Sequence, residues 1–183
     1  MVTLRTMPVV AFLPLIVSAA RMAAQPPQPV PSFTEFSRRV DQYLKLHQAA
    51  PKLRSTKRRK EIVERRQALA KKIREERPNA KQGDIFSPEI GADFRRVIQS
   101  VFQGPRAPNV RKTIRHGEPV QPWHLSVNGE YPEHLPFTTI PPTLLLLLPQ
   151  LPVGVSYRII GHDFVLQDME ARLIVDFIPA AVP

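Results

Sequence analysis

Apolar side chains recur every three or four residues in three stretches of the first half of the chain, the period of helices that face a core. The first helix is predicted to begin at Ser32, because Ser32 and Glu35 form a capping-box pattern, and to end before Pro51. Its apolar stripe consists of Phe33, Phe36, Val40, Tyr43, Leu44 and His47.

Two further helices follow. The second is predicted over Lys57–Arg77, a stretch without Gly or Pro whose apolar seam is narrow and whose remaining surface is charged. The third is predicted to start from an N-cap at Ser87 and to end at Gly104. Its broad apolar face predicts a central position, with the other two helices packed on or near it; that face consists of Ile90, Phe94, Val97, Ile98, Val101 and Phe102.

The C-terminal part of the chain has the composition of strands. Ser156–Ile160, Phe164–Gln167 and Leu173–Ile178 are rich in β-branched and aromatic residues and are separated by short turns, which predicts an antiparallel meander. Seven side chains are expected to share one face: Tyr157, Ile159, Phe164, Leu166, Leu173, Val175 and Phe177. Upstream, the alternation in Trp123–Val127 predicts another strand, which runs into a tight turn at Asn128-Gly129.

Five consecutive leucines lie between these regions, within Pro141–Pro152. Only Thr143–Leu148 can be helical between the prolines, which gives roughly 9 Å of helix against a hydrocarbon core of roughly 30 Å. The leucines therefore cannot span a bilayer. We expect a short buried helix that covers the meander, and the alternative is an exposed apolar patch.

These elements predict an α+β fold: two or three N-terminal helices, a proline-rich connector, and a short leucine helix packed on a three-stranded antiparallel meander. The predicted regions are a signal peptide at 1–24, a proline-rich tether at 25–31, a basic helical region at 32–104, a proline-rich connector at 105–140, and the short helix with the meander at 141–183.

The first residues resemble an export signal. Arg5 precedes an apolar run from Met7 to Ala20, which is too short for a spanning helix, and small residues around Ala20 and Ala24 offer two cleavage sites. We expect a periplasmic or secreted protein with no transmembrane span in the mature chain. An uncleaved anchor, a mis-assigned start and an apolar arm of the fold are the alternatives.

Charge is divided unevenly along the chain, whose formal net charge is +10. Residues 38–81 contain sixteen basic and five acidic residues, a net charge of +11, whereas residues 117–183 carry a net charge of −5. There is no cysteine, which excludes disulfides, thiolate metal sites and cysteine nucleophiles.

No motif for catalysis or cofactor binding is present in the sequence. The serines lack a G-x-S-x-G motif and the glycines never form a phosphate-binding loop. His116, His124 and His134 lack the spacing that places two imidazoles on one metal, and His162 is expected to make local hydrogen bonds in a turn. We therefore predict no catalytic, cofactor or metal residues, and no enzyme.

The basic second helix is the best candidate for a binding surface. The residues predicted to meet an anionic partner are Lys57, Arg58, Arg59, Lys60, Arg65, Arg66, Lys71 and Lys72. An anionic envelope surface or an acidic protein would suit them, and two other interpretations are a solvated helix and a helix docked on the acidic meander. Nucleic acid is disfavoured because Arg54–Gln82 contains no aromatic residue.

Two stretches resemble known proteins. The pattern LPVGVSYRIIGHDFVLQDMEARLIVDFI, from Leu151 to Ile178, is similar to the C-terminal β-meander of small bacterial exported proteins, including the periplasmic nickel/cobalt-homeostasis group. Asn79–Ile98 resembles a stretch of uncharacterised exported proteins. This resemblance implies an envelope location and a small sheet, and it implies no activity, metal ligand or catalytic residue for this chain.

The sequence as a whole predicts an exported, non-catalytic interaction protein of the envelope or periplasm, whose basic helix meets anionic partners. The alternative is a cytoplasmic protein that binds nucleic acid independently of sequence and whose apolar N-terminus is an arm of the fold.

Overall fold

The computed structural model describes residues 31–48, 58–104, 107–108, 124–131 and 140–183. The described part of the chain begins with three long helices, α1 (Pro31–Gln48), α2 (Arg59–Glu76) and α3 (Pro88–Gln103). The short helix α5 (Pro142–Leu145) precedes β1 (Val155–Ile160), β2 (Asp163–Asp168) and β3 (Leu173–Ile178). The predicted α+β fold is confirmed. The predicted signal peptide, most of the tether and much of the connector lie outside the described residues.

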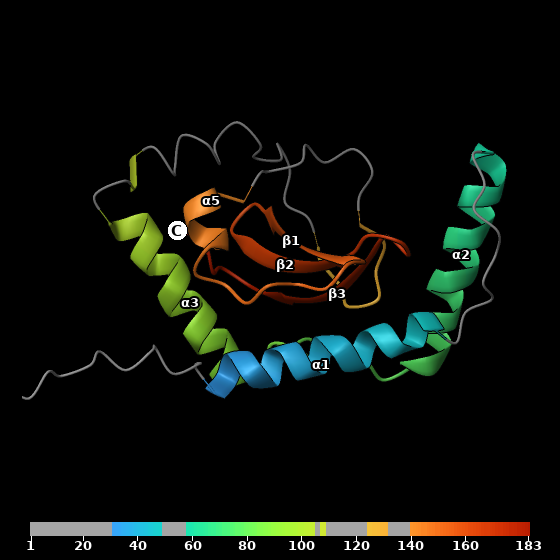
Figure 1. Ribbon diagram of the computed structural model, residues 1–183, viewed down its shortest axis with the longest axis horizontal. Helices are drawn as coiled ribbons and strands as arrows, with labels where there is room; N and C mark the ends of the chain where they lie inside the picture. Colours follow the sequence, from blue (N-terminus) through green and yellow to red (C-terminus); the bar gives the residue numbers. More distant parts are fainter. Residues whose placement is uncertain (1–30, 49–57, 105–106, 109–123, 132–139) are drawn as a thin grey trace, which may run out of the picture.

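The strands form an antiparallel sheet in the order β1-β2-β3, as the short turns predicted. Figure 1 shows α1 running below the sheet, with α3 near one end of α1 and α2 near the other. Helix α1 contacts both of the other long helices, and α3 contacts α5. The expectation that α3 is central is therefore only partly right, because α1 is the element that contacts both.

The main core lies between the helices and one face of the sheet. Phe36 of α1, Phe94 of α3 and Phe164 of β2 are fully buried there. Their ring centroids lie 4.9 Å apart for Phe36–Phe94 and 5.9 Å apart for Phe94–Phe164. These positions belong to the helical stripes and the strand alternation found in the sequence, and their burial confirms those patterns.

One residue of the predicted sheet face lies on the other side. Phe177 packs with Tyr131, Val165 and Ile174 in a second apolar cluster, away from the main core. The cause is a β-bulge: Leu166 pairs with Asp176 and Gln167 pairs with Ile174, so β3 carries one extra residue there. An extra residue reverses the inward and outward alternation beyond it, which simple alternation cannot foresee.

Residues 124–131, which precede α5 in the chain, form a turn that docks beside β3 at the edge of the sheet. Asn128 donates its backbone N–H to Ile174 O at 2.8 Å, and Ile174 donates back to Gly129 O at 2.9 Å. A Cβ at Gly129 would lie 2.8 Å from the backbone oxygen of Ser126, so this tight turn requires glycine. The turn is confirmed, but the strand predicted before it is wrong over His124–Val127, which are irregular or part of the turn; Trp123 lies outside the described residues.

The leucine run is divided between core and surface. Leu144 and Leu148 are buried, with 0% and 6% of their surfaces exposed, whereas Leu146 is 85% exposed. Leu145 and Leu147 are about half exposed. The prediction that the leucines are buried is thus right for two of them and wrong for three. The reason is that α5 ends at Leu145 and presents only one side to the core. Among the described residues, no helix is long and apolar enough to cross a membrane.

The predicted capping box at the start of α1 is also wrong. Helix α1 begins at Pro31, which places Ser32 inside it, and the Ser32 hydroxyl donates to Asp93 of α3. The carboxylate of Glu35 instead pairs with Arg38 and Arg39, which hold its pKa at about 2. Ser87, by contrast, takes the predicted N-cap position of α3.

A buried carboxylate ties the loop before α3 to the sheet. Asp176 of β3 is fully buried and accepts backbone N–H groups from Gly83, Ile85 and Phe86 at 2.8–3.2 Å. It also accepts the N–H of Phe177. Burial raises the pKa of Asp176, and these hydrogen bonds act in the opposite direction by favouring the charged form.

We predict that Asp176→Asn lowers the free energy of unfolding by about 2–3 kcal/mol, because the amide NH₂ turns a donor toward N–H groups that need an acceptor. Asp163→Asn is the matched control, since Asp163 accepts one exposed backbone N–H, that of Ala180, and it should cost less than about 1 kcal/mol. Urea unfolding followed by circular dichroism measures both, and equal losses would contradict the role given to Asp176.

Candidate functional site

Helix α2 is buried along only a small part of its surface. Leu69, Ala70 and Ile73 are its buried residues, and all three lie in its C-terminal half. The narrow apolar seam predicted from the sequence is confirmed at these positions. Ile62, which belongs to the same seam one turn into the helix, is 42% exposed. The first half of α2 therefore stands out from the body of the protein, at the far end of α1 from α3 (Figure 1).

Basic side chains of α2 predicted to bind anions lie mainly on this exposed part. Lys60 and Lys71 pair with Glu64 and Glu75 one turn further along, with N–O distances of 3.9 Å and 3.8 Å. Arg58 pairs with Glu61 at 3.3 Å. All three pairs are exposed and contribute little to stability. Lys72 is half-buried, and Lys57 lies outside the described residues.

Two of the predicted arginines, Arg59 and Arg65, make no ion pair with any residue that the structure describes. Both are exposed, so their charges face solvent. The sequence left open whether the basic helix is covered by the acidic meander. For this half of α2, the contacts favour an accessible basic surface.

The C-terminal end of α2 is the part that docks. Arg74 donates to Asn128 O at 3.1 Å and lies 3.7 Å from the carboxylate of Glu130. Arg77 lies 3.8 Å from Asp84 and stacks over the Tyr43 ring at 5.1 Å. Docking on acidic and carbonyl groups therefore occurs at the last turn of α2 and at the residue after it.

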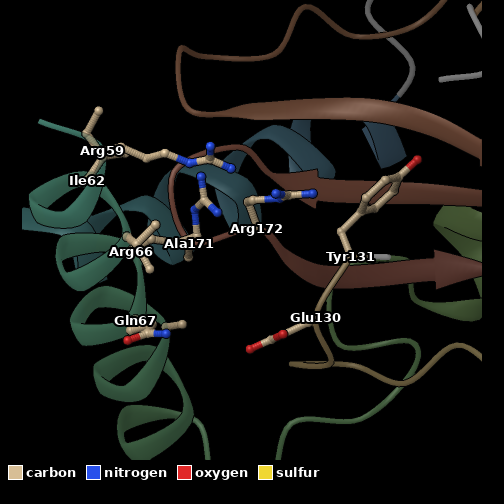
Figure 2. A pocket seen from close by; sticks show the side chains of 10 residues that line it. Arg59, Ile62, Arg66, Gln67, Glu130, Tyr131, Ala171 and Arg172 are labelled. Atoms are coloured by element: carbon tan, nitrogen blue, oxygen red, sulfur yellow. The ribbon is translucent and has the colours of Figure 1, made fainter. Parts of the chain in front are cut away.

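A pocket of about 390 Å³ lies between the exposed half of α2 and the sheet. Helix α2 contributes Arg59, Arg66 and Gln67 to its lining. The turn between β2 and β3 contributes Arg172, and the segment 124–131 contributes Glu130. The other lining residues are Ile62, Val63, Ala70, Tyr131 and Ala171. Figure 2 shows Arg59 reaching from α2 toward the turn that carries Arg172, while Glu130 points toward α2.

The pocket brings together residues that are far apart in the sequence. Arg59 and Arg66 were predicted to bind anions, whereas Arg172 and Glu130 were not singled out for binding. Arg172 is one of only two basic residues in the acidic C-terminal part of the chain. That isolation is the one signal in the sequence that could have drawn attention to it.

Tyr131 lies on the sheet side of the pocket, and 2% of its surface is exposed. Its buried hydroxyl has no hydrogen-bond partner among the described residues, and Figure 2 shows it directed away from α2. Burial raises the pKa of Tyr131, which keeps the phenol neutral at physiological pH. Its hydroxyl is therefore no part of the charged side of the pocket.

A second polar cluster joins the end of α1 to the end of β2. Asp168 is fully buried and accepts hydrogen bonds from the Tyr43 hydroxyl at 2.7 Å and from Nε2 of His47 at 2.6 Å. Its other oxygen accepts the backbone N–H groups of Glu170 and Ala171. Nδ1 of His47 lies 3.6 Å from the carboxylate of Glu170. Sequence analysis placed His47 on the core stripe but gave no sign of this partner.

The cluster favours the charged form of His47. The hydrogen bond to Asp168 raises the pKa of His47 above its usual range, against the effect of burial. Burial and the nearby Asp168 charge raise the pKa of Tyr43 far above its usual range. Each polar atom of Asp168 and His47 faces another member of the cluster. The arrangement is therefore better suited to a structural link between α1 and the β2–β3 turn than to acid–base catalysis.

The remaining histidines do not gather into a site within the described residues. His124 is exposed. His162 bonds through Nδ1 with Val182 O at 2.9 Å, so its hydrogen bond links the turn to the C-terminal segment and is not the local bond that the sequence predicted. His116 and His134 lie outside the described residues. In the part of the chain that the structure covers, no group of three histidine or acidic side chains could hold a metal ion.

The chain was compared with protein-family models, curated proteins and solved structures. None of them matches.

We predict that His47→Gln is most destabilising at low pH. Because the folded-state pKa of His47 is raised, its charged hydrogen bond contributes fully below its unfolded pKa of about 6.5 and is lost as pH rises through the folded pKa. The groups that face it are Asp168, Glu170 and Tyr43. The substitution should cost about 1.5–3 kcal/mol at pH 5.5 and less at pH 9.

Unfolding of the variant and of the unmodified protein at the two pH values measures this difference. His124→Gln, at an exposed histidine, is the control. A cost for His47→Gln that grows with pH would show that the imidazole is not held as a cation by Asp168.

Proposed function

We propose that this protein is a non-catalytic interaction protein of the bacterial envelope, whose helix α2 binds an anionic membrane surface. The observation that carries the proposal is the division of α2 into a docked end and an exposed basic half. Charges such as those of Arg59 and Arg65 have no ion-pair partner among the described residues. They therefore suit a partner that supplies negative charge.

The distribution of the remaining charge supports the same function. The C-terminal end of α2 pairs with carboxylates, Arg74 with Glu130 of the acidic part of the chain and Arg77, the residue after the helix, with Asp84 of the loop before α3. These contacts leave Arg59 and Arg65, in the first half of the helix, exposed to solvent. Their charges are therefore accessible to a negatively charged surface.

The envelope location is supported by the sequence rather than by the fold. The apolar run Met7–Ala20 after Arg5 has the length of an export signal, and residues 1–30 lie outside the described part of the structure.

We predict that the protein binds vesicles that contain phosphatidylglycerol and does not bind phosphatidylcholine vesicles. The triple substitution Arg59→Gln, Arg65→Gln, Lys71→Gln should weaken binding at least about tenfold, since each basic residue near an anionic surface contributes about 1 kcal/mol. Added salt should weaken it further, because ionic strength screens exposed charges. Vesicle co-sedimentation over a range of salt concentrations measures both effects.

The matched control removes three positive charges elsewhere, by Arg38→Gln, Arg95→Gln and Arg96→Gln, and should change binding by less than about threefold. Equal loss in both triple variants would mean that net charge alone drives association. Tighter binding to single-stranded DNA than to anionic vesicles would favour the nucleic-acid function instead. Binding to an acidic protein but to neither of these would replace the membrane by a protein partner.

We predict that the protein made in a bacterial host is shortened to begin at Arg21 or Gln25, after cleavage at Ala20 or Ala24. N-terminal sequencing of protein recovered from the periplasm or medium gives the answer directly. A chain that begins at Met1 or Val2 and stays in the cytoplasm would contradict the envelope location, whatever the vesicle assay shows.

A further inference from the structure

The two edges of the three-stranded sheet differ in how the chain covers them. At β3, the turn at Asn128 pairs with the backbone of Ile174, and Tyr131 donates its N–H to Arg172 O at 2.8 Å. Further along the same strand, Asp176 accepts hydrogen bonds from the loop before α3. Strand β1 forms the opposite edge. We infer that this second edge is an interface, at which β1 pairs antiparallel with β1 of a second copy of the chain in a symmetric dimer.

The backbone groups of β1 point alternately toward β2 and toward the outer edge. Met169 donates its N–H to Gly154 O at 2.8 Å, so Gly154 and every second residue after it direct their backbone groups to β2. The N–H and C=O groups of Val155, Tyr157 and Ile159 therefore point outward. Among the described residues, no backbone group forms a hydrogen bond with them on that side.

The outer edge of β1 has little protection against pairing with another strand. The Tyr157 carbonyl accepts from side chains of its own strand, Ser156 Oγ at 3.3 Å and Arg158 at 3.5 Å, which are long for hydrogen bonds. Native proteins protect such edges with proline, with a bulge or with charges. Strand β1 contains no proline and pairs with β2 in an unbroken register. Its one charged residue, Arg158, donates through Nε to Gln167 of β2 at 3.0 Å.

The strand is complementary to itself. In a symmetric antiparallel pair centred on Tyr157, this residue lies opposite its own copy and Val155 lies opposite Ile159. All three residues with outward backbone groups then form hydrogen bonds across the interface. A register centred on Arg158 would instead place two arginines directly opposite each other, and like charges in that position are destabilising. The register centred on Tyr157 is therefore favoured.

Exposed apolar side chains lie close to this edge. Most of the large apolar side chains that are exposed in the described part of the chain lie just before β1: Leu145, Leu146, Leu147 and Val153. Val153 is fully exposed, and β1 begins two residues after it. The Tyr157 hydroxyl donates to Pro149 O at 3.0 Å, which places the end of the leucine run near the strand. No charged residue occurs from Ile140 to Tyr157. An apolar surface without charge is typical of the centre of a homodimer interface.

A second copy suits this surface better than an anionic partner does. An anionic partner would meet few positive charges there, because the basic residues are concentrated in and around α2. Figure 1 shows α2 at one end of the molecule and α5, which leads into β1, toward the other. Pairing at β1 therefore does not require the two basic helices to meet. The inference is independent of the proposed function, since it concerns a different surface.

Sedimentation equilibrium of the protein recovered from a bacterial host tests the association. We expect a monomer–dimer equilibrium with a Kd of about 10 μM or tighter. Amide hydrogen exchange at two protein concentrations locates the interface. The outward amides of Tyr157 and Ile159 should exchange at least about tenfold more slowly in the dimer than in the monomer. A protein that stays monomeric at about 100 μM, or a dimer in which these amides gain no protection, would overturn the inference.

The variant Val153→Lys tests the apolar part of the interface without disturbing the core, because this side chain is fully exposed. It should weaken dimerisation at least about tenfold, since the dimer would bury two added positive charges beside apolar surface. Ile62→Lys is the matched control, because it adds the same charge at an exposed apolar residue of α2. It should change the Kd by less than about threefold. Equal weakening by both variants would show that net charge, and not the surface beside β1, governs association.

Substitutions of Ser156 test the register. In the pair centred on Tyr157, Ser156 lies opposite Arg158 of the other copy, so Ser156→Glu should dimerise at least about fivefold more tightly than Ser156→Lys. Ser100→Glu and Ser100→Lys, at an exposed serine of α3, measure the effect of net charge and should differ by less than about twofold. If the two substitutions of Ser156 differ no more than those of Ser100, the register centred on Tyr157 is wrong.

Discussion

Phe36, Phe94 and Phe164 meet where α1, α3 and the sheet come together, and the positions of the other elements follow from this contact. The rings lie 4.9–5.9 Å apart and are fully buried, and such aromatic pairs add about 0.5–1.5 kcal/mol each beyond the burial of their surface. Because three separate elements each contribute one ring, removing any of them would open the core. The contact fixes α1 beneath the sheet and so makes it the platform for α2.

The far end of α1 carries the connections that set the position of α2. His47 and Tyr43 bind the buried carboxylate of Asp168, and Arg77 stacks over the Tyr43 ring. These contacts bring the end of β2, the end of α1 and the end of α2 to one place. The pocket lies beside this junction, since Ala171 and Arg172 follow Asp168 by only a few residues. The geometry of the pocket thus depends on the hydrogen bonds of Asp168. We expect the bond from His47 to Asp168 to be stronger when His47 is protonated.

The exposed half of α2 and the pocket beside it are two different kinds of surface. Exposed charges such as that of Arg65 act over the distance of a Debye length and need no fixed geometry. Arg59, Arg66 and Arg172 instead surround a defined volume with apolar residues beside it.

The sequence alone determined what depends on local periodicity: the three long helices, the three strands, their antiparallel order and the basic surface of α2. It also showed that the leucine run is too short to cross a bilayer. Tertiary structure decided the rest, because the β-bulge that turns Phe177 away, the Asp168 carboxylate that binds His47, and the pocket that Arg59 and Arg172 both line could not be read from the local pattern of residues. Periodicity reports which side of an element is apolar, but only the folded chain decides which charged side chains become neighbours.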